Sequence, residues 1–486
     1  MPKASILNIN RSIFTELKYP VTVFSISISF RLIIEILAWP YPVGYDVINY
    51  YLPVLTNFDS HWSSTSNQFP LYILLLHTIY SVLQIDPRIL ISISIVILFG
   101  LFSLVIYSIG KNIFHLSNNQ SIFLSLFVIF QVSLLRTSWD LHKDMFALSI
   151  ALFCLSSLAR IPSVSKHIRY TILPLSIISI LSDRMIGFVL STAYILYALI
   201  RRKRIIATMA MITGIIFAIS LLGSTAVIRN NTLLGNVENE MLKQSYNSLN
   251  LVILLLVMSG FLLPTGVLGF LRSNNATLKI PLVISLMASF SWILYPNTSA
   301  FLPDRWIVIF SIFMSIFSGY GFVLIVEGKH IGTSYKKLRN YFIVLIPFLF
   351  LGFTFATSPN NSYLNLYSVF HPYISYYGPL TMQYNSISLP ESESLLSLIR
   401  WINNNTPSDA IIIGSKHVRG WMELELANRT FLYDINITDM LNSNNYGESY
   451  LLDSNTEKYN LQNYSKNLSF KNNDFSLYYL NPTTPK

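Results

Sequence analysis

Long apolar runs alternate with short polar loops along the chain from residue 20 to residue 357. Most runs have about 16 to 24 residues, close to the ~20 that an α-helix needs to cross the hydrocarbon core of a bilayer. The pattern therefore predicts a polytopic α-helical membrane protein with about eleven transmembrane helices. The predicted spans are 20–39, 88–109, 121–135, 144–159, 170–182, 185–200, 205–228, 249–271, 280–296, 305–326 and 341–357.

A further apolar segment, FPLYILLLHTIYSVLQ at 69–84, could form a twelfth span. Cytoplasmic loops of membrane proteins are enriched in Lys and Arg, and this rule tests the choice. With eleven spans and a cytoplasmic N-terminus, the inner segments carry 17 Lys/Arg and the short outer loops carry 7. A twelfth span would place the cluster RRKR at 201–204 outside. We therefore expect 69–84 to be a juxtamembrane helix that lies in the outer interface, or that dips in and returns.

This orientation predicts two domains: a transmembrane domain at 1–357, with a first outer loop at 40–87, and an extracytoplasmic domain at 358–486. The Asn-X-Ser/Thr sequons agree with it, because most of them fall outside.

The expected C-terminal domain is a small α/β unit. The pattern predicts a helix at 391–404, followed by one strand at AIIIG and another at RTFLYD. The final forty-odd residues, rich in Asn, Ser and Tyr, show no clear period and are expected to form loops.

Composition supports a membrane location, since 52% of the 486 residues are hydrophobic and only 12% are charged, against roughly 25% charged in soluble proteins. The net charge of +10 comes from the first 357 residues, because the part from 358 onward has 8 Lys/Arg and 11 Asp/Glu. A basic balance confined to the membrane part indicates topology signals and anionic lipid, and it argues against a nucleic-acid partner. The sequence contains no P-loop, GxGxxG, CxxC or nucleophile-elbow motif.

Four polar segments adjoin predicted spans on the outer side: YPVGYDVINYYLP (41–53), RTSWDLHKD (136–144), SDR (182–184) and PDR (303–305). Ionisable side chains near hydrocarbon are costly, so they commonly mark pairing or function. Because the four segments lie at one membrane face, we expect their side chains to gather there. For each residue alone, an ordinary helix-end charge in water stays open as the simpler interpretation. Inside the first span, Arg31 and Glu35 are four residues apart, and we expect a buried structural pair.

The order of these segments resembles that of the GT-C superfamily, polytopic glycosyltransferases that take sugar from a polyprenyl-phosphate carrier. Asp46 follows the first span, and FPLY is similar to a segment of protein mannosyltransferase-like and lipid A aminoarabinose transferase-like members. RTSWDLHKDMFALSIALF and LPDRWIVIFSIF resemble later family segments, as does LSDRMIGFVL, although members more often have Ser-His-Arg where this chain has Asp183. LIRWINNNTPSDAIIIGS and RGWMELELANRTFLYD resemble the C-terminal α/β domain of archaeal-type members. The WWDYG motif of oligosaccharyltransferases is absent, which favours transfer of a single sugar.

The resemblance implies an enzyme that moves one sugar from a polyprenyl(dolichyl)-phosphate donor to a glycan, lipid or protein acceptor, on the outer face of the cell membrane. A carboxylate must take the proton of the attacking hydroxyl, and Asp46 has the position of the family's first-loop acid. Asp140 and Asp144 would orient the acceptor, bind a metal or pair with a cation. A requirement for a divalent metal stays open.

The leaving phosphate needs cationic partners in a partly dry site. Arg305 and Lys143 are the first candidates, followed by Arg136 and Arg184. The candidates for contact with the sugars or the acceptor are Tyr45, Tyr50, His142 and Asp304.

Two other classes of protein fit a chain of this kind: a transporter or flippase of lipid-linked sugars, and a non-enzymatic surface-assembly protein. A transporter would favour paired, interrupted apolar segments in two matching halves, which the sequence does not show. Only Arg31 and Glu35 place charge in mid-span. The outer domain also suits an enzyme that handles an acceptor.

Overall fold

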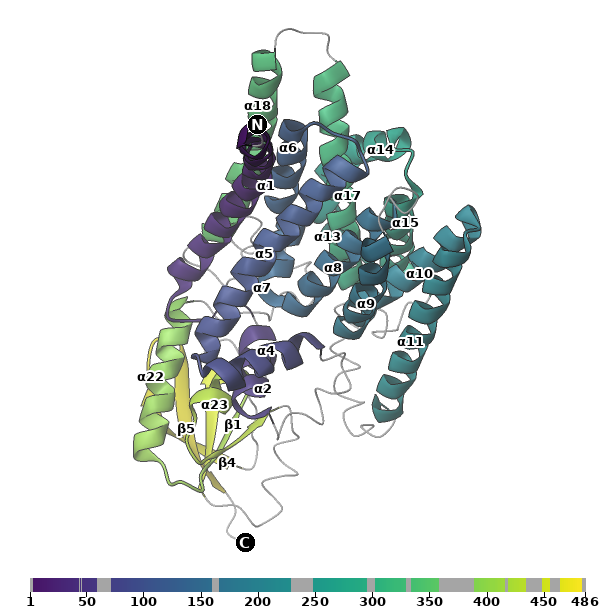
Figure 1. Ribbon diagram of the computed structural model, residues 1–486. Helices are drawn as coiled ribbons and strands as arrows, with labels where there is room; N and C mark the ends of the chain where they lie inside the picture. Colours follow the sequence, from purple (N-terminus) through teal and green to yellow (C-terminus); the bar gives the residue numbers. More distant parts are fainter. Residues whose placement is uncertain are drawn as a thin grey trace.

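The chain forms a bundle of long helices with a small α/β unit at one end (Figure 1). The computed structural model describes residues 3–42, 44, 46–58, 71–159, 166–228, 248–294, 302–328, 334–357, 389–415, 418–433, 448–454 and 464–482. The first helix begins at the end of the bundle opposite to the α/β unit, as Figure 1 shows.

The helices of the bundle follow the apolar runs of the sequence. They are α1 (Lys3–Ala38), α5 (Pro87–Asn112), α6 (Asn118–Ile129), α7 (Val132–Asp140), α8 (His142–Leu158), α9 (Lys166–Ser182), α10 (Arg184–Arg201), α11 (Arg204–Ile228), α13 (Ser248–Ser259), α14 (Leu263–Arg272), α15 (Ala276–Ser289), α16 (Ser291–Leu294), α17 (Pro303–Gly328) and α18 (Ser334–Thr357). A short 3-10 turn, η3 (Gly260–Leu262), connects α13 to α14.

Within the described part of the chain, eight helical segments are long and apolar enough to cross a membrane. Each of the eleven predicted ranges contains a helix, and eight of the ranges correspond to these segments. The other three differ from a simple span. The range 121–135 contains α6 and α7, which are bent by 61° and make a ninth candidate if they count as one span. The ranges 144–159 and 170–182 contain α8 and α9, of 17 residues each.

Three short helices belong to the predicted first outer loop: η1 (Val47–Tyr51), α2 (Leu52–Thr56) and α4 (Leu71–Leu83). At 13 residues α4 is about 20 Å long, which is less than the ~30 Å of a bilayer core, so it cannot cross alone. It lies at the end of the bundle next to the α/β unit (Figure 1). Its location in the membrane interface stays a prediction.

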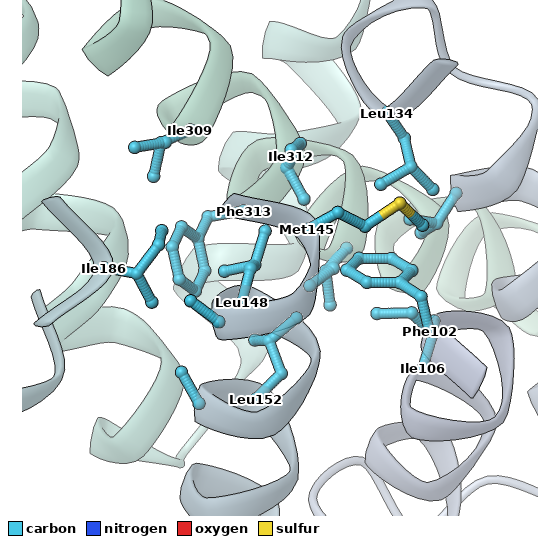
Figure 2. Packing of buried hydrophobic residues seen from close by; sticks show 14 of the residues in the cluster. Phe102, Ile106, Leu134, Met145, Leu148, Leu152, Ile186, Ile309, Ile312 and Phe313 are labelled. Carbon is cyan, nitrogen blue, oxygen red and sulfur yellow. The ribbon is translucent and has the colours of Figure 1, made fainter. Parts of the chain in front are cut away.

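A continuous apolar core connects α5, α7, α8, α10 and α17 (Figure 2). Phe313 of α17 lies between Ile186 of α10 and Leu148 of α8 in this view, and Phe102 of α5 lies beside Met145 of α8. All five side chains are buried. This packing holds α8, α10 and α17 together, and the first turns of these helices carry several of the candidate site residues.

The α/β unit contains α22 (Leu389–Asn405), β1 (Ile411–Gly414), α23 (Arg419–Glu425), β2 (Thr430–Tyr433), β3 (Ser449–Ser454), β4 (Tyr464–Lys471) and β5 (Phe475–Pro482). The strand order is β2-β1-β3-β5-β4. β1 is parallel to β2 and β3, whereas β5 is antiparallel to β3 and β4. The helix and the two strands expected from the sequence are confirmed as α22, β1 and β2. Apolar side chains of α22 pack on the sheet in a core of their own.

The expectation of loops over the final forty-odd residues is wrong. β4 and β5 form an antiparallel hairpin, with Tyr478 opposite Leu468. Turn-forming residues at 472–474 separate the two strands, and Asn472 accepts hydrogen bonds from the backbone N–H groups of Asp474 and Phe475. The strand signal is weak because Lys466 interrupts the apolar positions of β4 and a β-bulge lies between Leu468 and Phe470, so the alternation is irregular.

Candidate active site

The first loop carries Asp46 immediately before η1, where the side chain is half-buried. Gly44 brings this loop against the end of α7. It has a φ of +103°, and a Cβ there would lie 2.6 Å from Oδ1 of Asp140 and still closer to the Trp139 carbonyl oxygen. Only glycine tolerates both the conformation and the contact. The loop therefore lies directly on the α7–α8 junction.

The end of α7 is built from charges that pair with each other. Arg136 and Asp140 are buried and form an ion pair one helical turn apart. Arg31 of α1 donates from Nη2 to the Ser138 carbonyl oxygen at 3.1 Å, and its Nη1 lies 2.7 Å from Oε1 of Glu35. The expected pair within the first span is confirmed. It connects α1 to the turn that precedes α8.

Arg305, in the first turn of α17, is the centre of a cluster of charges. Its guanidinium interacts electrostatically with four carboxylates, those of Asp46, Asp144, Asp304 and Asp183. These carboxylates come from the first loop, the start of α8, the start of α17 and the residue before α10. All four polar segments of the sequence thus contribute to the cluster around Arg305, at one end of the bundle.

The cluster has an accessible layer and a buried one. Asp46, Lys143 and Arg305 are half-buried. The carboxylates of Asp144, Asp183 and Asp304 lie beneath them, with exposed fractions of 3%, 3% and 4%. The accessible groups among these are therefore one carboxylate and two cations. The buried carboxylates balance the positive charge of Arg305.

The buried carboxylates have different neighbours. Asp183 is the N-cap of α10 and accepts from the backbone N–H of Ile186 at 2.9 Å. The carboxylates of Asp144 and Asp183 face each other, and Lys143 and Arg305 are the cations near Asp144.

Tyr51, at the end of η1, connects the first loop to α8. Its hydroxyl accepts from the backbone N–H of Lys143 at 3.3 Å, and its ring stacks on His142 with centroids 5.4 Å apart. Burial raises the pKa of Tyr51 well above its ordinary value, and the carboxylates of Asp46 and Asp144 raise it further. The phenol therefore stays neutral near pH 7, which makes it a fixed connector and not a base.

The remaining predicted residues lie around this cluster or outside the described part of the chain. His142 is buried behind Tyr51, and Tyr50 is half-buried with its ring edge on Tyr51. Arg184 is half-buried in the first turn of α10. Tyr45 lies outside the described residues, so its predicted contact with a substrate has no structural description. Among the residues that are described, no three His, Cys, Asp or Glu side chains form a group that could hold a metal ion.

Sequence reasoning did not single out Gly44 or the hydroxyl of Tyr51 as parts of the site. A glycine two residues before an acidic residue is a weak signal, since its reason is a contact with residues almost a hundred positions later. Tyr51 is one of four tyrosines in YPVGYDVINYYLP, where an aromatic belt at the membrane surface is the simpler expectation.

Comparison with known proteins gives little to add to this geometry. No family model matches the sequence, and no curated protein matches it. Among solved structures, the cryo-EM structure of the arabinofuranosyltransferase AftD from Mycobacteria aligns with a TM-score of 0.48 and 10% identity. The alignment covers 95% of this chain and 40% of that chain, so this chain spans less than half of that protein's length. A likeness of this degree carries no information on what the chain binds or does.

Proposed function

We propose that this protein is a membrane glycosyltransferase that moves a single sugar from a polyprenyl(dolichyl)-phosphate donor to an acceptor hydroxyl at the outer membrane surface. The observation that carries the proposal is the layered cluster around Arg305. One half-buried carboxylate, Asp46, lies with two half-buried cations, Lys143 and Arg305, at one end of a bundle of apolar helices. A lipid-linked phosphate donor needs this combination of groups at this place.

Asp46 is the proposed base. Its carboxylate takes the proton of the acceptor hydroxyl while the hydroxyl oxygen forms a bond to the anomeric carbon. The bond from that carbon to the phosphate oxygen breaks, and the polyprenyl phosphate leaves with the electron pair. A single displacement of this kind inverts the anomeric centre.

Lys143 and Arg305 are the proposed partners of the leaving phosphate. Negative charge on that phosphate increases as the bond breaks, and cations already in place stabilise it without further rearrangement. Arginine suits a phosphate because its planar guanidinium can donate two parallel hydrogen bonds. The carboxylates of Asp144, Asp183 and Asp304 keep the Arg305 side chain in position and balance its charge before the donor binds.

The other predicted residues have supporting places in this scheme. Arg136 and Asp140 neutralise each other, so we assign them to the α7–α8 junction, with the first loop against it. Arg184 is a further candidate for contact with the phosphate, because it lies in the first turn of α10, next to Asp183. Tyr50 is the aromatic candidate for sugar stacking.

The deciding experiment measures sugar transfer by the full-length protein in lipid nanodiscs. A panel of radiolabelled polyprenyl-phosphate sugars serves as donor, and native membrane extract supplies the acceptor. Asp46→Asn should lower the rate of transfer from the donor that the wild type uses by about 10² to 10⁴-fold, which is the usual contribution of a general base. Asp409→Asn, at an exposed carboxylate of the α/β unit, is the matched control and should transfer as the wild type does.

Two outcomes would contradict the proposal. Equal transfer by the wild type and by Asp46→Asn would exclude Asp46 as the base. If both proteins bind a donor and neither transfers its sugar, a transporter or flippase of lipid-linked sugars becomes the better explanation of the charge cluster around Arg305.

A further inference from the structure

The first loop is enclosed from two sides. On the side of the bundle, Gly44 and Tyr51 lie against the α7–α8 junction. On the opposite side, α23 of the α/β unit packs on η1 and α2. Ile48 belongs to the apolar core of the α/β unit although it lies in the first loop, and it is 5% exposed. Leu424 of α23 packs against the core of the bundle and also against that of the α/β unit.

Gly420 makes the closest of these contacts. Its backbone N–H donates to Oδ1 of Asn49 at 2.8 Å. A Cβ on Gly420 would lie 2.7 Å from the Cα of Asn49 and would overlap the carbonyl oxygen of Ile48. The neighbours are backbone atoms, which cannot rotate away as a side chain can. Glycine therefore sets how closely α23 approaches η1.

Two further contacts fix the orientation of α23. Glu425, its last residue, forms an ion pair with Arg88 in the first turn of α5. The ring of Trp421 meets the ring of Tyr41 edge-on, with centroids 6.2 Å apart. The contacts of α23 with the first loop, at Tyr41, Ile48 and Asn49, thus lie on both sides of Asp46 in the sequence.

We infer that α23 positions the Asp46 carboxylate, and that Gly420 is the positioning residue through which it does so. This inference rests on the proposed function, and it adds a role for the C-terminal unit: its docked state sets the geometry of the reaction. Gly420 touches the loop and not the reacting atoms. A displacement of about 1 Å at a catalytic group can lower the rate by about 10²-fold, so a small change in the docking distance is enough.

Gly420→Ala in the full-length protein tests the inference. The added methyl group has to move η1 away from α23, so we expect kcat for sugar transfer to fall about 100-fold. The KM for the donor should stay within about twofold, because the atoms nearest to a Cβ on Gly420 belong to η1, whereas Lys143 and Arg305 are on α8 and α17. Amide hydrogen exchange over residues 46–56 should become faster, while exchange in α17 stays unchanged. Gly328→Ala is the matched control, since nothing lies within 4 Å of a Cβ at that position.

A charge exchange tests the same docking without adding volume at the glycine. Arg88→Glu and Glu425→Arg should each lower kcat, and the double variant should recover most of the loss, because it restores an ion pair of opposite polarity. This series decides the question alone if Gly420→Ala does not fold.

Wild-type kcat and wild-type hydrogen exchange in Gly420→Ala would overturn the inference, as would a double exchange variant no better than the single ones. A rise in KM with kcat unchanged would also overturn it, because it would place the effect on donor binding. If the wild type transfers sugar from no donor, the proposed function fails; hydrogen exchange of the first loop still shows whether α23 orders it.

Discussion

Arg305 is the residue at which the charges of the candidate site converge. Arg305→Lys keeps the positive charge but loses the planar fork that can donate two parallel hydrogen bonds to a phosphate. We expect transfer to fall about 100-fold, the usual loss when one donor to a developing negative charge is removed. The measurement is kcat/KM with the donor identified in nanodiscs.

Arg400→Lys is the control for this substitution, because Arg400 is exposed on α22. Transfer by Arg305→Lys at the wild-type rate would show that charge alone suffices at this position. The guanidinium would then have no special part in phosphate binding, and Lys143 would become the leading candidate.

At the scale of helices, the Arg31–Glu35 pair connects α1 to the end of α7. Arg31→Met leaves the Glu35 carboxylate without its cation and the Ser138 carbonyl without its donor, so we expect the free energy of unfolding to fall by about 3 to 5 kcal/mol. Arg31→Met combined with Glu35→Leu should recover most of the loss, because a buried pair is often replaced by apolar side chains at little cost. Thermal or denaturant unfolding in detergent measures both variants. A double variant as unstable as the single one would mean that Glu35 is not the main partner of Arg31.

The positions of most helices follow from local pattern, since an apolar run has to bury its backbone polar groups in a membrane and a helix achieves this within one segment. The bend between α6 and α7 does not follow from local pattern. The helix breaks at Phe130 and Gln131, and neither these residues nor their immediate neighbours are proline or glycine. The β4–β5 hairpin is missed because a polar residue and a bulge interrupt the apolar alternation of β4.

The candidate site is predictable in its residue types and less so in its arrangement. Charges next to apolar runs are recognisable in the sequence, as at Asp46, Asp144, Asp304 and Arg305. Counting the predicted spans is then enough to place these residues at one face of the membrane. The pairing of Arg136 with Asp140 also follows from their spacing of four. Contacts that depend on glycine at Gly44 and Gly420 do not, since Gly420 meets a residue 371 positions earlier in the chain.

At the scale of the whole molecule, the protein combines a membrane bundle and an α/β unit around a single loop. The bundle supplies the cations and the buried carboxylates, and the first loop supplies Asp46. The α/β unit encloses that loop from the other side. Such an arrangement suits a reaction in which a lipid-linked donor arrives from the membrane and the acceptor arrives from the aqueous side.

The orientation of the molecule in the membrane is the last prediction. α10 begins beside Asp183, and its 18 residues extend about 27 Å, close to the thickness of a bilayer core. Lys203 follows α10, so it should lie on the side opposite to the site. Ser408 is exposed on the α/β unit, which docks at the site, so it should lie on the site's side. The cluster of basic residues around Lys203 then faces the cytoplasm, and Ser408 faces outward.

A cysteine at Ser408 should react with a membrane-impermeant thiol reagent in intact cells, and a cysteine at Lys203 should react only after permeabilisation. The native Cys154 is buried and gives the background in the wild type. Labelling of Lys203→Cys in intact cells, with Ser408→Cys protected, would reverse the orientation. It would place the proposed transfer on the cytoplasmic side, where donor and acceptor would have to be sought instead.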